Sequence, residues 1–78
     1  MKFPAYRKYL NEKNFFKILN ERSFEELQVI GSRVMMHSTV ATQYPEMVHI
    51  AGLLNDSSLA MPISEMEYES VRSKVKDH

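Results

Sequence analysis

The sequence contains no cysteine, and this absence removes several kinds of chemistry at once. Disulfide bonds, zinc sites built on thiolates and thiol nucleophiles are all excluded. Glycine is also scarce, because Gly31 and Gly52 are too few for the glycine-rich loops that bind phosphate groups. No apolar run approaches the roughly 18 residues of a membrane-spanning helix. We therefore expect no membrane insertion, no nucleotide-binding loop and a cytoplasmic location.

Histidine is the remaining nitrogen ligand for a metal, and the chain has three histidines. His37, His49 and His78 fall on a predicted strand, a predicted helix and the end of the chain, so they form no ligand motif. Glu46 and His49 have the Glu-x-x-His spacing of di-iron helical bundles, but the second such pair is missing. We expect no metal, no cofactor and no catalytic residue, and hence a protein that is not an enzyme.

The chain is short, and its composition is that of a folded protein. It has 78 residues, of which 44% are hydrophobic and 26% are charged, so we expect a single domain over residues 1–78. A domain of this size buries only about 60 to 65% of its unfolded surface. Without disulfides, self-association is the simplest further source of buried area. The sequence therefore predicts a homodimer.

The net charge is zero, but the charges are distributed unevenly. Residues 1–22 carry six cations and two anions, whereas residues 23–71 carry one cation and seven anions. Within residues 1–13, aromatic and basic side chains follow one another without a helical or strand period. This pattern indicates an extended basic aromatic arm ahead of an α+β body at residues 14–78.

An exposed arm of this composition would suit single-stranded nucleic acid, because aromatic rings stack on bases and cations neutralise phosphates. The candidate nucleic-acid contacts are Tyr6, Arg7, Lys8 and Tyr9. The zero net charge argues against this function, since dedicated nucleic-acid domains usually carry a basic field. Nucleic-acid binding is therefore our alternative to protein interaction.

The segment at residues 23–30 has two interpretations. Ser23 and Glu26 fit a capping box, which predicts a short helix ending at Gly31. Gly31-Ser32 instead predicts a two-residue hairpin turn with glycine at the position that needs a positive φ. Pairing outward from that turn places four apolar side chains on one face: Leu27, Val29, Val34 and Met36. We favour the hairpin because one register produces this apolar face.

The other face of the hairpin places Glu26 directly opposite His37, with Met35 two residues away on the same strand. Methionine-bearing surfaces adapt to protein partners, so Met35, His37 and Glu26 are the candidate protein contact. The Glu26–His37 pair is expected to be a surface ion pair rather than an acid–base dyad. Three other methionines are expected to fill gaps in the core: Met36, Met47 and Met66.

Two helices are predicted in the second half of the chain. Pro45 and Glu46 suit the first turn of one, because proline is tolerated there and a carboxylate faces the positive end of the helix dipole. Its apolar stripe recurs at helical spacing: Met47, Ile50, Ala51 and Leu54. Ser64 and Glu67 form a capping box for the second helix, which is predicted over residues 65–76.

Strands complete the predicted order. Residues 15–19 join aromatic and β-branched side chains, which predicts a strand before the hairpin. Residues 59–61 predict a short edge strand or a connector, since Pro62 cannot donate to a ladder. The fold class is therefore α+β: a small antiparallel sheet packed by two helices, in the order β-β-β-α-β-α.

Several runs of the sequence together resemble short bacterial proteins to which no activity is assigned. These runs are Tyr6-Arg7-Lys8-Tyr9, Phe15-Phe16-Lys17-Ile18, Phe24-Glu25-Glu26-Leu27-Gln28 with Gly31, and Tyr44-Pro45-Glu46. The resemblance covers most of the chain and implies a stand-alone bacterial protein, but it implies no functional residues. The expected function is thus a small non-enzymatic protein-interaction or regulatory module.

Overall fold

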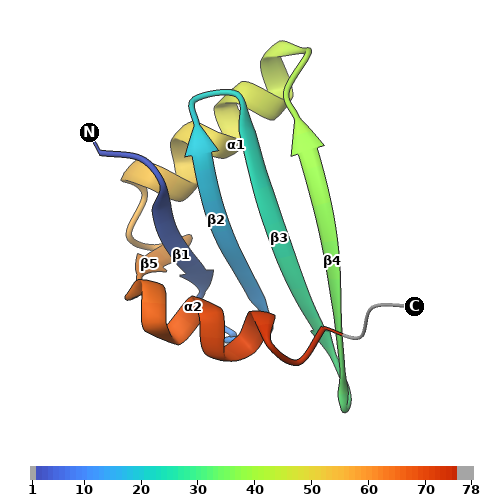
Figure 1. Ribbon diagram of the computed structural model, residues 1–78. Coiled ribbons are helices and arrows are strands. Elements are labelled where there is room, and N and C mark those ends of the chain that lie inside the picture. The colour runs from blue at the N-terminus through green and yellow to red at the C-terminus, as the bar shows by residue number, and fades with distance from the viewer. Residues whose placement is uncertain (1, 76–78) are drawn as a thin grey trace.

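The computed structural model describes residues 2–75, which form a five-stranded antiparallel sheet with one helix on each face (Figure 1). The strands are β1 (Ala5–Tyr9), β2 (Asn14–Asn20), β3 (Ser23–Ile30), β4 (Arg33–Val40) and β5 (Ala60–Pro62). The helices are α1 (Tyr44–Asn55) and α2 (Glu65–Arg72). The strand order across the sheet is β4-β3-β2-β1-β5, so β4 and β5 are its edges.

The predicted α+β class is confirmed, with one strand more than predicted, in the order β-β-β-β-α-β-α. The additional strand is β1, which lies within the arm predicted at residues 1–13. Its residues are extended, but they pair with β2 on one side and with β5 on the other. The arm prediction is therefore wrong in placing this segment outside the body. The strand lacks an apolar period of two because one of its buried residues is the cation Lys8.

β3 and β4 form the predicted hairpin in the predicted register. Ile30 pairs with Arg33, and the ladder runs without a register shift over all eight residues of each strand. Gly31 has a φ of 60°, a left-handed conformation that glycine adopts without steric cost. The helical interpretation of residues 23–30 is excluded, because this segment is a strand whose side chains alternate between the two faces of the sheet.

β2 is the central strand and supplies buried side chains to both faces of the sheet. Phe16 and Ile18 are fully buried on the α1 side, where they pack with Ile50 and Leu53 of α1. The opposite face holds a second cluster, which consists of Phe15, Leu27, Val34 and Tyr68. In Figure 1, α1 crosses behind the upper part of the sheet, and α2 lies in front of the lower part. Each helix thus covers only part of its own face.

The start of α1 is where the sequence predicts it, although its buried stripe is shifted. Pro45 lies in the first turn together with the acidic Glu46. Ile50 and Leu53 are the buried residues of α1, whereas Ala51, which the sequence assigns to the apolar stripe, is exposed. The predicted stripe correctly indicates a helix. The side of the helix that faces the sheet, however, is centred on Ile50 and Leu53 rather than on the four predicted residues.

The start of α2 is confirmed as a cap, but only half of the capping box forms. The hydroxyl of Ser64 accepts a hydrogen bond from the backbone N–H of Glu67 at 3.0 Å. The Glu67 carboxylate does not turn back to the cap, because it pairs with Lys8 of β1. The helix ends at Arg72, short of the predicted range of 65–76, whose last residue lies outside the described residues.

Replacing Gly31 with alanine is expected to destabilise the protein by about 1 kcal/mol. A Cβ at Gly31 meets nothing within 4 Å, so the whole cost comes from the left-handed backbone rather than from a clash. Urea unfolding of Gly31→Ala, compared with Ser32→Ala at the neighbouring turn residue, measures this cost. Equal free energies of unfolding for Gly31→Ala and wild type would contradict the turn conformation.

Candidate functional site

β4 is the most exposed of the long strands. Only Val34 of its eight residues is buried, and Thr39 is half-buried. Three of its apolar side chains are exposed, namely Met35 at 46%, Met36 at 37% and Val40 at 66%. Because side chains alternate along a strand, Met35 lies on the α1 side of the sheet and the other two lie on the α2 side. Both faces of β4 therefore offer apolar contact area. We call this strand, with its side chains and outer backbone edge, the β4 surface.

The outer backbone edge of β4 is open over most of its length. A two-residue turn closes on a hydrogen-bonded pair, here Ile30 and Arg33, so every second residue beyond it directs its N–H and C=O away from β3. These outward residues are Val34, Met36, Ser38 and Val40. Val75 pairs in parallel with Val34. Within residues 2–75, the edge is therefore covered at its first outward residue and open beyond it.

The opposite edge of the sheet is protected, whereas within residues 2–75 the β4 edge is covered only at Val34. β5 has three residues and ends in Pro62, which has no N–H to donate. β4 has eight residues and no proline, and its ladder with β3 has no bulge. The ionisable side chains of β4 are only Arg33 and His37. A long edge strand without such protection is a ready template for another strand.

The structure brings together the three residues predicted as a protein contact. Glu26 and His37 are cross-strand partners, and Met35 pairs with Gln28 two positions along the same ladder. Met35 and His37 are exposed on the α1 side of the sheet. The expected ion pair does not form between the described residues. The Glu26 carboxylate instead accepts a hydrogen bond from the Asn14 side-chain amide, at 2.7 Å between Nδ2 and Oε2.

Sequence reasoning missed the contribution of Met36 and Val40 to this surface. Met36, which the sequence assigns to the core, is 37% exposed, and Met66 is 82% exposed. Only Met47 packs against the core as predicted. Met36 lies on the apolar face of the hairpin, as predicted. Its strand, β4, is at the edge of the sheet and has a neighbouring strand, β3, on one side only. Whether a strand lies at the edge depends on how all the strands of the sheet are ordered, and a local sequence pattern does not show that order.

The aromatic residues proposed for nucleic-acid contact are packed against other rings. The Tyr6 ring lies 5.3 Å from that of Tyr68, and the Tyr9 ring lies 4.8 Å from that of Phe16, both measured between centroids. The guanidinium of Arg7 donates to the Tyr6 carbonyl at 2.9 Å. These contacts occupy the ring faces and part of the charge that bases and phosphates would need. The geometry does not favour the nucleic-acid alternative.

Lys8, the fourth residue of that set, is enclosed between two carboxylates. It is 9% exposed, and its Nζ lies 2.7 Å from Oε1 of Glu12 and 2.9 Å from Oε2 of Glu67. The hydrogen bonds to Glu12 and Glu67 raise the pKa of Lys8, and the bond from Lys8 lowers the pKa of Glu12. The cluster links β1, the turn after it and α2, so its role is to hold these elements together.

The remaining polar groups also serve the fold. The Tyr68 hydroxyl donates to Oε1 of Glu25 at 3.2 Å, and burial, reinforced by this nearby carboxylate, raises the pKa of Tyr68. Tyr68 is therefore a protonated hydrogen-bond donor at neutral pH. In the described part of the chain, no group of three or more His, Cys, Asp or Glu side chains is arranged to hold a metal ion. None of the described helices is long and apolar enough to cross a membrane.

Comparisons with known proteins give no information about function, so the functional argument rests on the geometry. No family model, no curated protein and no solved structure matches the chain. The β4 surface is therefore the candidate site, because within residues 2–75 its edge is open beyond Val34, three of its apolar side chains are exposed, and the strand has no proline.

Replacing Lys8 with glutamine is expected to lower the stability and to flatten its pH dependence at both extremes. The lowered pKa of Glu12 gives stability that is present above the unfolded value of 4.5 and is lost as the pH falls through the folded pKa. The raised pKa of Lys8 gives stability that is present below 10.5 and is lost as the pH rises through the folded pKa. Both contributions disappear in Lys8→Gln.

Thermal midpoints measured from acid to alkaline pH test this expectation. The matched control is Lys13→Gln, because Lys13 is an exposed lysine of the same turn region. We expect the control to follow wild type at every pH. If Lys8→Gln also followed wild type throughout, the two ion pairs would contribute nothing to folding.

Proposed function

We propose that this chain is a small non-enzymatic protein-interaction module that acts as a homodimer. In the dimer the β4 strands of two copies pair antiparallel about a two-fold axis. The observation that carries the proposal is the open edge, because the outward backbone groups of Met36, Ser38 and Val40 have no hydrogen-bond partner within residues 2–75. Pairing would join two five-stranded sheets into one continuous sheet and satisfy these groups.

A second copy fits this edge because antiparallel strand pairing is self-complementary. A two-fold interface places the same surface patch on both sides, so each donor of one strand meets an acceptor of the same strand in the other copy. The exposed Met36 and Val40 then lie on one face of the joined strands, and Met35 lies on the other. Cross-strand apolar pairs of this kind add about 0.2 to 1 kcal/mol each.

The charges on β4 are compatible with this pairing. Arg33 is at one end of the strand, so an antiparallel arrangement places the two arginines at opposite ends of the interface. His37 is the other ionisable side chain of the strand. The two arginines are therefore not forced together, whereas like charges directly opposite each other would destabilise the pairing.

The size of the chain supports the same conclusion. At 78 residues without cysteine, the domain has limited capacity to bury its own surface and no covalent cross-link. Buried area gained between copies adds to stability by mass action. The surface itself supports a contact rather than a reaction. Its exposed apolar side chains are Met35, Met36 and Val40, and its polar side chains are those of Arg33, His37, Ser38 and Thr39.

Replacing Ser38 with proline is expected to weaken the dimer at least about tenfold while leaving the monomer folded. The Ser38 N–H faces outward and is not used in the β3 ladder, and proline is tolerated at such positions of edge strands. The substitution removes one donor from each copy. Sedimentation equilibrium over a concentration series to the high micromolar range measures the dissociation constant.

Ser38→Ala is the matched control, because it keeps the backbone N–H and changes only the side chain. We expect it to dimerise as wild type does. Met36→Lys, which places a charge on the exposed edge, is expected to act like the proline variant. A wild-type protein that remained strictly monomeric, or a Ser38→Pro variant that dimerised as tightly as wild type, would refute pairing through β4.

A further inference from the structure

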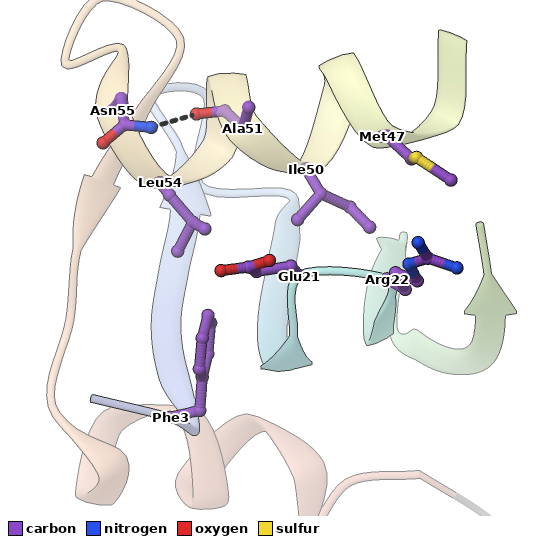
Figure 2. Close-up of a pocket in the computed structure, with 8 residues that line it drawn as sticks. All are labelled: Phe3, Glu21, Arg22, Met47, Ile50, Ala51, Leu54 and Asn55. Atoms are coloured by element: carbon purple, nitrogen blue, oxygen red, sulfur yellow. Dashed lines mark hydrogen bonds between the residues drawn. The ribbon is translucent and has the colours of Figure 1, made fainter. Parts of the chain in front are cut away.

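A cleft of about 400 Å³ opens between α1, the turn that joins β2 to β3, and the residues that precede β1 (Figure 2). None of its lining residues belongs to β4. Its volume lies in the lower part of the range of about 300 to 1,000 Å³ that small-molecule sites occupy. The cleft is therefore of a size to hold a small molecule rather than a protein segment.

The walls of the cleft are mostly apolar, and its one amide side chain, that of Asn55, donates to the Ala51 carbonyl at 3.0 Å. Phe3 forms one wall, and three side chains of α1 form the other: Met47, Ile50 and Leu54. Figure 2 shows Leu54 pointing down from the helix toward the Phe3 ring, with Ile50 beside it. Ile50 is 1% exposed and belongs to the core, so this part of the wall is held by packing. An apolar group entering the cleft would find aromatic and branched aliphatic surfaces.

The rim of the cleft carries one charge of each sign. Glu21 and Arg22 form the turn between β2 and β3, and both side chains are exposed. The turn is fixed, because the Arg22 N–H donates to Oδ1 of Asn20 at 2.8 Å and the Arg22 carbonyl accepts from the Ala41 N–H at 2.6 Å. Neither charged side chain forms an ion pair with another of the described residues. Figure 2 shows their charged groups pointing in different directions along the rim.

We propose that this cleft binds small zwitterions with an apolar body, of which the free α-amino acids with large apolar side chains are the simplest. The ligand carboxylate pairs with the Arg22 guanidinium, which can hold it through two parallel hydrogen bonds. The ligand ammonium pairs with the Glu21 carboxylate. The apolar side chain lies against Phe3, Ile50 and Leu54. This site is independent of the proposed dimer, because it contains no residue of β4.

Other ligand charges fit the rim less well. A simple carboxylate would pair with Arg22 but would be repelled by the like charge of Glu21. A simple amine would pair with Glu21 but would be repelled by Arg22. An uncharged apolar molecule would use the walls and leave both charges without a partner. A ligand with both charges and an apolar side chain uses both rim charges and the apolar walls, and this requirement separates the proposal from general hydrophobic binding.

Titration of the full chain with L-leucine and L-phenylalanine, followed by amide chemical shifts, tests the proposal. We expect saturable shifts confined to Phe3, Glu21, Arg22 and α1. Each control lacks one part of the ligand: 4-methylpentanoate lacks the amine, 3-methylbutylamine lacks the carboxylate, and glycine lacks the apolar side chain. We expect each control to bind at least about tenfold more weakly than leucine.

Three variants locate the site without disturbing the core. Arg22→Gln and Glu21→Gln are each expected to weaken leucine binding at least about tenfold, because each substitution removes the charge from the hydrogen bonds to the ligand. Ala51→Leu fills the cleft from an exposed position of α1 and is expected to abolish binding. The matched controls are Arg33→Gln, at the other hairpin turn, and Val48→Leu, at an exposed position of α1 outside the cleft.

The outcomes distinguish this proposal from the proposed dimer. Ser38→Pro is expected to bind leucine as wild type does, whether or not wild type is a dimer. Equal binding of leucine and 4-methylpentanoate, or unchanged binding in Arg22→Gln and Glu21→Gln, would overturn the zwitterion assignment. Absence of any saturable shift with leucine and phenylalanine at millimolar concentration would overturn the site altogether.

Discussion

Burial of both faces of β2 is the constraint on which the rest of the fold depends. Phe15 and Phe16 are neighbours in the chain and are 6% and 0% exposed, although a strand directs them to opposite faces. A sheet with one solvated face could bury only one of them. Each face therefore needs its own cover, and the chain supplies α1 to one face and α2 to the other.

Local patterns were enough to predict the elements that form between neighbouring segments. Gly31-Ser32 gave the hairpin with its register, and Ser64 gave the start of α2, because both depend on contacts a few residues apart. β1 escaped prediction because its burial depends on distant groups. Lys8 is paired with the nearby Glu12, but it is enclosed in the sheet because Glu67, far away in the sequence, supplies a second carboxylate. A sequence pattern does not contain that contact.

The sequence was enough to predict which residues form the candidate contact, but not how far the exposed surface around them extends. The register alone placed Glu26 opposite His37 and beside Met35. The exposure of Met36 depended instead on β1, which pairs with β2 and β5 and so leaves β4 with a single neighbour. The cleft was not predictable either, because Phe3, Glu21 and Leu54 come from three separate segments. Their approach follows from the packing of α1, not from any spacing in the chain.

The β4 surface arises from the mismatch between the lengths of the strands and of the helices that cover them. β3 and β4 have eight residues each and so extend over about 27 Å, whereas α2, also of eight residues, spans only about 12 Å. α1 is longer, but it covers one end of the other face (Figure 1). A helix of this length cannot cover a hairpin of this length, so part of the hairpin must stay exposed. The exposed part includes most of β4, because α1 packs against β1 and β5 at the opposite edge of the sheet, and only Val34 of β4 joins the cluster beneath α2. The length of the hairpin and the position of the helices thus leave the β4 surface exposed.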